Sequence, residues 1–456
     1  MTESSQDENI TLYTYAEIEE VKGTVGNFEV TIRKKARSVD LRTCTGCGDC
    51  QRKCPKKVPS EFELGLGQRT AIYTLSPQAV PNVPVIDRQS CIFFTTGKCK
   101  VCSKVCPTGA VDYDQQDELV VEKYGAIVVA TGFSLFDHSA YGEYGAGKYP
   151  DIITGLHLER MLDTSGPTGG HVICPSDGRE AKTVAFLQCV GSRDPEKGMP
   201  YCSRVCCMYT AKHALLLKDH VPDSQSYVFY IDIRAPGKNY EEFVSRVQED
   251  SGAVYIRGRV SKIYRQDGKL IVCAADTLLG EQVRVSVDLV VLATAMVAQP
   301  DAKELAQKLN ISCDQYGFYS EVHPKLEPVA SATRGIFLTG SCQFPKDIPD
   351  TVALSGAAAV GVCGILSQQE MIIEPRIAAV DETRCTGCLN CARVCPYNAI
   401  EEVSAGGRTV VRVIDSLCQG CGNCCSACRV RAVEVQGFSD NQIYAQIASA
   451  LKDPRG

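Results

Sequence analysis

Residues 44–55 read CTGCGDCQRKCP, and the four cysteines in this segment have the spacing C-x2-C-x2-C-x3-C-P. Three thiolates this close together on one tight loop can bind three corners of a cubane iron–sulfur cluster. The fourth, Cys54, precedes a proline whose turn carries it away from the loop and toward a second cluster. The segment therefore predicts a compact unit that holds two [4Fe–4S] clusters.

Three further motifs of this kind follow along the chain. One lies at residues 91–107, where the first gap is longer, and two lie near the C-terminus. Arg429 replaces the proline in the last motif, and Cys425 is a surplus thiol that we expect to be buried. In two-cluster ferredoxins the last cysteine of each motif ligates the other cluster. The expected ligand sets are therefore Cys44, Cys47, Cys50 and Cys106; Cys91, Cys99, Cys102 and Cys54; Cys385, Cys388, Cys391 and Cys428; and Cys418, Cys421, Cys424 and Cys395.

Zinc is the alternative occupant, because C-x2-C pairs also suit zinc sites. Zinc sites seldom use four cysteines in one compact run that ends in proline, and here the cysteine run recurs four times in one chain. The spacing therefore favours four cubane clusters in two ferredoxin-like modules.

The length and composition of the chain limit the cellular compartments and the kinds of partner that are expected for it. At 456 residues the chain has room for roughly three domains. A net charge of −6 argues against a nucleic-acid-binding protein, which is usually basic. Residues 1–11 lack a signal-peptide pattern, and the longest apolar stretches, at 126–131 and 357–366, are too short to cross a bilayer. We therefore expect a cytoplasmic protein without a membrane span, in which most of the 26 cysteines bind metal rather than form disulfides.

The stretches between the cysteine-rich modules predict an α/β fold. Alternating apolar and polar residues at 20–33, around Gly26-Asn27, predict a β-hairpin. Apolar side chains at helical spacing predict a helix over residues 201–217. Short apolar runs predict buried strands at residues 124–130, 183–187, 227–233 and 287–294. The cysteine-rich modules are thus inserted into, and appended to, an α/β core.

A separate group of cysteines lies in LQCVGSRDPEKGMPYCSRVCC at residues 187–207. A nucleotide-binding domain would carry G-x-G-x-x-G after such a strand, but this turn is rich in cysteine and charge, so we expect no nucleotide there. Two interpretations remain open, a fifth cluster with irregular ligation or a set of redox-active thiols. Burial as structural cysteines is less favoured, because the last two open a helix whose dipole stabilises thiolates. The four residues are Cys189, Cys202, Cys206 and Cys207.

Several segments together closely resemble one family, the A subunits of heterodisulfide reductase, which are the flavin-containing electron-bifurcating subunits of methanogens and of bacterial relatives. The resemblance covers nearly the whole chain and includes the double ferredoxin tail. The matching segments are VKGTVGNFEVTIRKKARSVD at 21–40, the cysteine-rich stretch that runs on through MYTAKHALLLKD at 208–219, FYIDIRAPGKNYEEF at 229–243, GFYSEVHPKLEPV at 317–329 and PKDIPDTVALSGAAA at 345–359.

The resemblance implies a partial thioredoxin-reductase-like FAD/NAD(P)-type domain with an inserted and a C-terminal two-[4Fe–4S] ferredoxin module. It implies that the middle cysteines ligate a fifth cluster. It also places Lys212 near the flavin N5, where it would tune flavin protonation; without the resemblance, Lys212 is read as a solvated helix lysine. Residues 130–132 and 335–340 resemble the second and third FAD-contact segments of two-dinucleotide-domain flavoproteins, in which an acidic residue usually stands where this chain has Ser341. The implied FAD contacts are Ala130, Thr131, Gly132, Thr339, Gly340, Ser341, Lys346, Asp347, Ile348 and Thr351, besides Lys212.

One family feature is missing, the G-x-G-x-x-G turn whose helix end cradles the FAD pyrophosphate. No glycine-rich strand–turn–helix precedes Cys44. We expect that a partner subunit supplies this half of the site, so that FAD lies across an interface; the alternative is a chain that has lost its flavin. The expected parts are the start of the flavoprotein-like domain (1–39), the inserted ferredoxin module (40–112), the FAD domain (113–376, with a degenerate nucleotide-binding subdomain at 170–300), the second ferredoxin module (377–436) and a terminal helix (437–456).

The resemblance implies an oxidoreductase subunit that passes electrons between FAD, its clusters and ferredoxin. A hydrogenase or formate dehydrogenase module is a further implied partner. The alternative function is a flavin-free relay and scaffold. For that function residues 438–451 would matter, because Ile443, Ile447 and Leu451 recur at helical spacing and could dock a partner. Packing of such a helix on its own module is the commoner outcome.

Overall fold

The computed structural model describes residues 2–368, 370 and 376–451. Three antiparallel strands near the start of the chain form a sheet in the order β1-β2-β7. The predicted hairpin is present, but its turn is Val25-Gly26, because Thr24 pairs with Asn27. The elements of this part are α1 (Thr2–Gln6), β1 (Ala16–Thr24), β2 (Asn27–Lys34) and β7 (Glu118–Tyr124).

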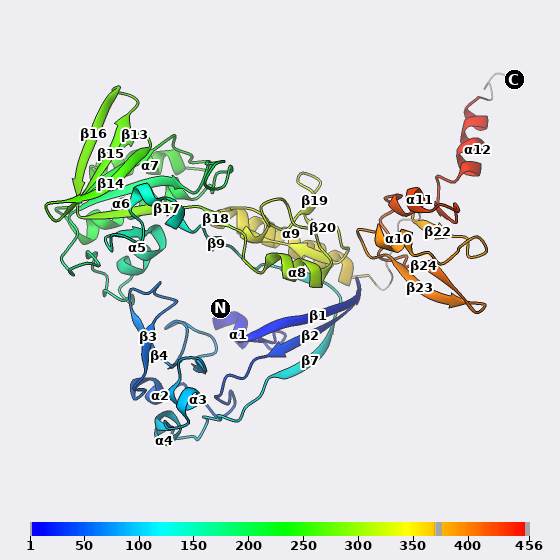
Figure 1. Cartoon of the computed structure of the whole chain (residues 1–456), viewed down its shortest axis with the longest axis horizontal. Helices are drawn as coiled ribbons and strands as arrows, with labels where there is room; N and C mark the ends of the chain where they lie inside the picture. The colour runs from blue at the N-terminus through cyan, green and yellow to red at the C-terminus, as the bar shows by residue number, and fades with distance from the viewer. Residues whose placement is uncertain (1, 369, 371–375, 452–456) are drawn as a thin grey trace.

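The first cysteine-rich module is inserted between β2 and β7 (Figure 1). Its small core contains Ile72 and Ile86, both fully buried, beside Cys91 and Cys102. Such a small core gives little stability alone, so metal ligation or packing on the rest of the chain must add to it. Its elements are α2 (Asp49–Arg52), β3 (Lys57–Pro59), β4 (Gln68–Thr70), β5 (Ile72–Tyr73), β6 (Val85–Ile86), α3 (Ile92–Thr96) and α4 (Val101–Val105).

A five-stranded parallel sheet is the centre of the next unit, in the order β10-β17-β11-β12-β13. Strands covered on both faces are apolar throughout, and β17 is buried at every position. Helices α5, α6 and α7 cover one face of the sheet, and the antiparallel sheet β14-β15-β16 covers the other. The elements are β10 (Ile152–Thr154), α5 (Gly155–Leu162), β11 (Thr183–Val190), α6 (Cys206–His220), β12 (Gln225–Tyr230), α7 (Tyr240–Ser251), β13 (Val254–Arg257), β14 (Val260–Gln266), β15 (Lys269–Asp276), β16 (Glu281–Val287) and β17 (Leu289–Thr294).

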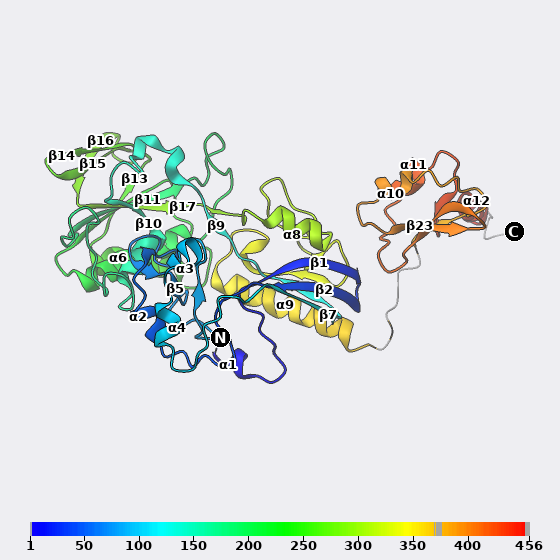
Figure 2. The ribbon, with the colours of Figure 1, turned by 60° about the horizontal axis from the view of Figure 1, so that its bottom comes forward.

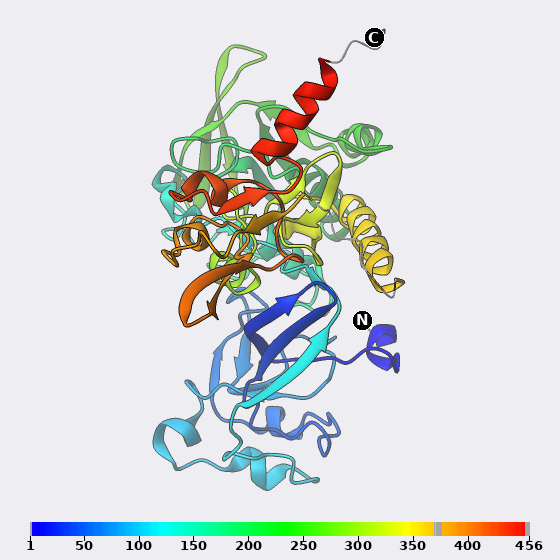
Figure 3. The same ribbon diagram turned by 90° about the vertical axis from the view of Figure 1, so that its right-hand side faces the viewer.

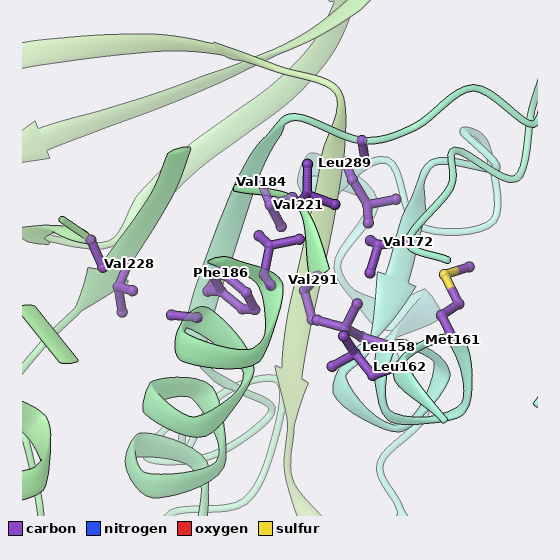
Figure 4. Close-up of a cluster of buried hydrophobic side chains, with 14 of the residues drawn as sticks. Leu158, Met161, Leu162, Val172, Val184, Phe186, Val221, Val228, Leu289 and Val291 are labelled. Atoms are coloured by element: carbon purple, nitrogen blue, oxygen red, sulfur yellow. The ribbon is translucent and has the colours of Figure 1, made fainter. Parts of the chain in front are cut away.

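Figure 4 shows the core between this sheet and its helices. Val184 and Phe186 of β11 and Val291 of β17 lie in one cluster with Leu158 of α5. Burying a side chain of this kind completely contributes about 1.5–3 kcal/mol. Because α5 and α6 share this cluster, their relative position is fixed by packing.

A second sheet has the order β19-β20-β21-β8, in which β21 and β8 are parallel and β20 is antiparallel to its neighbours. The sheet β1-β2-β7 and α8 pack on one face, and α9 packs on the other (Figure 2). Among the described strands, β8 pairs on one side only. The elements are β8 (Ile127–Val129), β9 (Ser134–Leu135), η1 (His138–Ala140), η2 (Gly142–Tyr144), β18 (Met296–Val297), α8 (Ala302–Leu309), β19 (Glu321–His323), β20 (Glu327–Ser331), β21 (Ile336–Leu338), η3 (Gly340–Cys342) and α9 (Ile348–Leu366).

Helix α9 is apolar but mostly exposed. Ala358 is buried, whereas Val352 and Val360 on the helix are 65% and 73% exposed. Within the described residues this helix is long and apolar enough to cross a bilayer. The expectation that all apolar stretches are too short was therefore wrong, because the helix begins at Ile348 and uses a proline in its first turn. Length and composition alone do not make it a membrane span, since core helices pass the same test.

The C-terminal module consists of short elements around its cysteines, followed by a helix that projects from it (Figure 3). The helix expected at residues 438–451 is present as α12, but it does not pack on its module, because Ile443 and Ile447 are 39% and 50% exposed. Asn310 Nδ2, at the end of α8, donates to the carbonyl of Tyr397 at 3.1 Å and so joins the module to that helix. The elements are β22 (Ala378–Val380), α10 (Asn390–Arg393), β23 (Ile400–Ala405), β24 (Arg408–Val413), α11 (Asn423–Ala427), β25 (Val433–Val435) and α12 (Asp440–Ala450).

The α/β fold class is confirmed, but several predicted boundaries were wrong. The apolar run at 124–130 contains the end of β7, a turn and β8 instead of one strand. The run at 287–294 holds the end of β16 and all of β17, and the strand expected at 227–233 is β12, which ends earlier. The helix expected over 201–217 begins at Cys206, because Arg204 has a left-handed φ of 62° that a helix cannot continue through.

Candidate iron–sulfur and flavin sites

Four cysteines of the inserted module line one apolar cavity. Cys54 reaches it from the loop before β3, and Cys91, Cys99 and Cys102 reach it from the segment that contains α3 and α4. This is the set in which the last cysteine of one motif joins the first three of the next. The cavity thus has the crossed arrangement that the spacing predicts for one cluster.

The same arrangement recurs in the C-terminal module. Its cavity is lined by Cys395 together with Cys418, Cys421 and Cys424. The other ligand candidates of the two modules pack in the same small cores, except for Cys47 and Cys388, which are exposed. Those in the cores are Cys44, Cys50 and Cys106 in the inserted module, and Cys385, Cys391, Cys428 and the surplus, half-buried Cys425 in the C-terminal one.

Backbone N–H groups donate to the sulfur of the last cysteine in three of the four motifs. Such bonds stabilise a thiolate and tune the potential of a cluster that it ligates. Cys428 has the bond although Arg429 follows it, so this turn forms without proline. The bonds run from Ala110 to Cys106 at 3.3 Å, from Ala399 to Cys395 at 3.3 Å and from Ala432 to Cys428 at 3.2 Å.

The spacing of the side chains separates a cluster from a single ion. Within residues 2–368, 370 and 376–451, no three Cys, His, Asp or Glu side chains lie close enough together to bind one metal ion. Zinc needs its sulfur and nitrogen ligands within about 2.0–2.3 Å of one point. Four cysteines around a cavity, each able to bind its own iron, suit a cubane cluster.

The four middle cysteines come together where β11 ends and α6 begins. Cys189 lies at a register shift in β11, and Cys206 and Cys207 are the first residues of α6. Burial raises the pKa of Cys206, and the neighbouring thiols of the other three raise it further. The structure therefore brings all four residues of this predicted set together, with Cys202 supplied by the loop before α6.

The burial of this set disfavours free redox-active thiols. Burial raises the pKa of Cys189 to about 11 and also raises that of Cys207. The expected stabilisation of thiolates at the start of α6 is thus outweighed by burial, and reactive thiols need a lowered pKa. A bound cation reverses this balance, because a coordinating thiol loses its proton.

The predicted flavin-contact turns lie side by side. Because β8 and β21 are parallel neighbours, their carboxyl ends place residues 130–132 next to residues 339–341. Thr339 N donates to the Val129 carbonyl at 3.0 Å. An added Cβ at Gly132 would meet nothing within 4 Å, so this turn is open to a ligand. Ligands of open α/β sheets bind at such carboxyl ends.

The start of α9 adds the remaining predicted contacts to this place. Asp347 caps the helix by accepting from Asp350 N at 2.9 Å, and Thr351 Oγ1 donates to the Asp347 carbonyl at 2.8 Å. Lys346 Nζ donates to the Gly340 carbonyl at 3.4 Å, and burial lowers the pKa of this lysine. Ile348 is 80% exposed at the same helix end.

An open cavity of about 530 Å³ lies against this helix end and is lined by Lys346, Tyr319 and Arg204, among others. Arg204 belongs to the loop between Cys202 and Cys206, and its guanidinium lies 2.6 Å from the Asp350 carboxylate. A second cavity, of about 480 Å³, lies between Cys202, Arg204 and Arg234. The ion pair thus joins the middle cysteines directly to the predicted flavin-contact segment.

The described hydrogen bonds and ion pairs join Lys212 to Glu159 and not to these turns. Its Nζ is 2.7 Å from both carboxylate oxygens of Glu159 on α5. His213 Nε2 is 2.6 Å from Oε2 of the same carboxylate. The His213 hydrogen bond, followed by Lys212, lowers the pKa of Glu159 to about 2 although burial opposes this. The sequence analysis missed Glu159 and His213, because only the packing of α5 on α6 brings them to Lys212.

Helix α5 also holds the inserted module. Arg160 makes two hydrogen bonds to the Glu63 carboxylate, at 3.0 and 3.1 Å, and its guanidinium lies 4.6 Å from the Phe62 ring centroid. The Arg160 and Glu63 side chains are only 12% and 15% exposed. Glu159 and Arg160, which are neighbours on α5, thus contact different parts of the chain. Glu159 pairs with Lys212 on α6, and Arg160 pairs with Glu63 of the inserted module.

Comparison with known proteins shows which families this chain resembles. The 4Fe–4S binding domain family matches residues 378–401. The chain is 49% identical over 446 residues to the iron–sulfur A subunit of the CoB–CoM heterodisulfide reductase of Methanocaldococcus jannaschii, covering 97% of this chain and 67% of that one. It is 47% identical to the A subunit of the H2:CoB–CoM heterodisulfide,ferredoxin reductase of Methanothermobacter marburgensis (100% and 68% covered).

A third relative is the A subunit of the H2/formate:CoB–CoM heterodisulfide,ferredoxin reductase of Methanococcus maripaludis, with 46% identity and coverage of 99% and 68%. The chain therefore spans about two thirds of the length of these relatives. Among solved structures, the thioredoxin reductase of T. acidophilum aligns with a TM-score of 0.36 and 12% identity, over 55% of this chain and 70% of that one.

Proposed function

The chain belongs to the family of heterodisulfide reductase A subunits, which are oxidoreductase subunits, and from this premise we propose that it is the flavin-based electron-bifurcating subunit of a heterodisulfide-reductase-like complex. The observation that carries the proposal is the Arg204–Asp350 ion pair. It connects the loop of the middle cysteines to the helix end where the proposed flavin-contact segments meet. A chain that only relayed electrons between ferredoxin modules would not need this connection.

Five clusters are proposed for this chain, two in each ferredoxin module and one on Cys189, Cys202, Cys206 and Cys207. Cavities with crossed cysteine sets support two of them, and the 4Fe–4S domain match supports the C-terminal module. The convergence of the middle thiols supports the fifth. Thiolates at these sites would each bind one iron, and the N–H···S bonds would favour the reduced state, because it carries more negative charge.

The residues at the ends of β8 and β21 fit part of a FAD site. Gly132 leaves open space, and Lys346, Thr339 and the start of α9 offer polar groups around the cavity of about 530 Å³. Bound FAD supplies a centre that exchanges two electrons with one partner and single electrons with clusters. The chain's own residues would orient the ring and hold protons there, with Lys212 placed at N5. No glycine-rich pyrophosphate turn is present in residues 1–43.

We propose that a glycine-rich strand–turn–helix unit outside residues 1–456 completes the flavin site. The free edge of β8 offers unpaired backbone groups to a further parallel strand. Beside it, α9 exposes Val352 and Val360 to solvent, and such an apolar face marks an interaction surface. A strand–turn–helix unit could pair with β8 and cover α9 at the same time. Ferredoxin and a hydrogenase or formate dehydrogenase module are the proposed partners, in the cytoplasm.

Iron and flavin analysis tests this proposal. The chain is purified anaerobically, alone and with the proteins that copurify with it. We expect about twenty irons per chain, from five clusters of four irons each, and FAD in the complex. About sixteen irons would remove the middle cluster. A complex without any flavin would overturn the bifurcation proposal and leave the relay.

The relay and scaffold function remains the second candidate because of α12. This helix has no buried residue, and Ile443, Tyr444 and Ile447 are between 39% and 69% exposed. A helix of this length is marginal in water without a partner. Lys212→Ala separates the two functions. A relay should keep its electron flux, whereas a flavin-coupled enzyme should lose bifurcated flux, with the exposed Lys182→Ala as the control.

A further inference from the structure

The Glu159 carboxylate on α5 bridges two consecutive side chains of α6 that lie in different surroundings. Lys212 and Glu159 are each 44% exposed, whereas His213 is 2% exposed. The carboxylate therefore accepts from an ammonium at the surface and from an imidazole ring in the interior. The ring is the fixed end of this network, because its surroundings are packed.

The two ring nitrogens of His213 define its tautomer. Nε2 lies 2.6 Å from Oε2 of Glu159. Nδ1 is buried and has no hydrogen-bond partner among the described residues. A carboxylate only accepts, so the proton lies on Nε2, and Nδ1 keeps its lone pair. The opposite tautomer would bury an N–H without an acceptor and would lose the bond to Glu159. Burial also lowers the pKa of His213, which keeps the ring neutral at pH 7.

Close packing of α5 on α6 keeps the ring in this position. Tyr209 lies one turn before His213, and the two ring centroids are 5.5 Å apart. Gly155, the first residue of α5, allows the approach, because an added Cβ would lie 2.9 Å from Tyr209 Cε2. The backbone of α5 can therefore come near enough for Glu159 to reach both side chains of α6.

We propose that His213 is a positioning residue, which orients the Glu159 carboxylate and through it holds the Lys212 ammonium at one place. The inference rests on the proposed function, in which that place is the flavin N5. An exposed Lys–Glu pair is weak by itself, and both long side chains exchange between rotamers. The buried imidazole has only two side-chain torsions and donates along a fixed direction, so it removes most of this freedom from the carboxylate.

Competitive acetylation of amines measures how firmly Lys212 is held. The full chain is labelled within its complex, and mass spectrometry compares Lys212 with Lys218, which lies on the same helix and donates to the Ser224 carbonyl beyond the helix end. We expect His213→Leu and Glu159→Gln each to raise Lys212 labelling by about threefold relative to Lys218, since the ion pair is loosened. His213→Gln should restore the wild-type value, because its amide can donate in place of Nε2.

Unchanged labelling in His213→Leu, or equal labelling in His213→Leu and His213→Gln, would overturn the positioning role. A redox titration of the bound flavin is read separately. If labelling rises but the flavin titration is unchanged, the positioning role stands, and the placement of Lys212 at the flavin is refuted. If His213→Leu does not fold, ¹⁵N histidine spectra of the wild type decide, because a proton on Nδ1 would contradict the proposal.

Discussion

Replacement of Glu63 by glutamine should loosen the inserted ferredoxin module from α5. The Glu63 carboxylate receives two hydrogen bonds from Arg160, and both side chains are largely shielded from water. A charge-assisted hydrogen bond contributes about 1.5–3 kcal/mol to stability. Arg160 retains Asp163 as a partner at 2.8 Å, which limits the loss. We therefore expect Glu63→Gln to weaken the contact between the inserted module and α5 by about 1.5–2 kcal/mol. This corresponds to a ten- to thirtyfold rise in the fraction of molecules in which the contact is open.

Hydrogen exchange read by mass spectrometry measures that opening. Amides of residues 60–67 and of α5 should exchange about ten to thirty times faster in Glu63→Gln, since local opening limits their exchange. Glu61→Gln is the matched control from the same loop, because the Glu61 side chain is 61% exposed and pairs with Arg69 instead. A pair this exposed is worth about 0–1 kcal/mol, so exchange should rise less than about fivefold.

Two results would refute this reasoning. Equal acceleration in both variants would mean that charge in the loop matters, rather than the shielded contact to α5. Unchanged exchange in Glu63→Gln would mean that the packing of Phe62 and Leu66 holds the module without the ion pair. The double variant with Arg160→Gln should add little to the single one, since both changes break the same contact.

Two further predictions concern the middle cysteines and the pH dependence of stability. Cys206→Ser should remove about four of about twenty irons per chain, whereas Cys174→Ser, in the hydrophobic core, should remove none; equal iron contents would contradict the fifth cluster. Burial raises the pKa of Asp288, but bonds from Thr183 and Arg179 outweigh it and lower the pKa from 3.8 to about 2. A lowered carboxyl pKa stabilises the fold above about pH 4 and loses this effect as the pH falls toward 2. Denaturant unfolding should therefore show Asp288→Asn less stable by about 2 kcal/mol at pH 7 and equal to wild type near pH 2, with the exposed Asp223→Asn unchanged at both.

Local spacing predicted the ferredoxin modules because their ligands are supplied by tight loops. The cavity around Cys54, Cys91, Cys99 and Cys102 has the crossed set that the motif spacing indicates. The turns at the ends of two parallel strands could also be predicted from the sequence, since small residues follow apolar runs at 130–132 and 339–341. In each case the chemistry lies within a few residues of the element that positions it.

Contacts between distant elements could not be predicted in this way. Glu159 is one of many acidic residues in the sequence, and only the packing of α5 against α6 places it on Lys212. Arg204 was part of a recognised segment, but neither its left-handed φ, which delays the helix, nor its ion pair with Asp350 could be read from that segment. The length of α9 was underestimated because the apolar stretch considered was 357–366, whereas the helix begins at Ile348 and includes the less apolar turns before that stretch.

The contacts between elements bear differently on the two candidate functions, the relay and the flavin-coupled enzyme. A relay requires only that clusters lie within reach of one another, and the two ferredoxin modules could meet this need with any fold between them. Here Arg204 and Asp350 connect the loop that carries Cys202 to α9, whose start holds proposed flavin contacts. The helix that begins with Cys206 also carries Lys212, which is paired across to α5. One helix thus links a proposed cluster ligand to a proposed flavin contact, and this linkage is what coupling single-electron carriers to a two-electron centre requires.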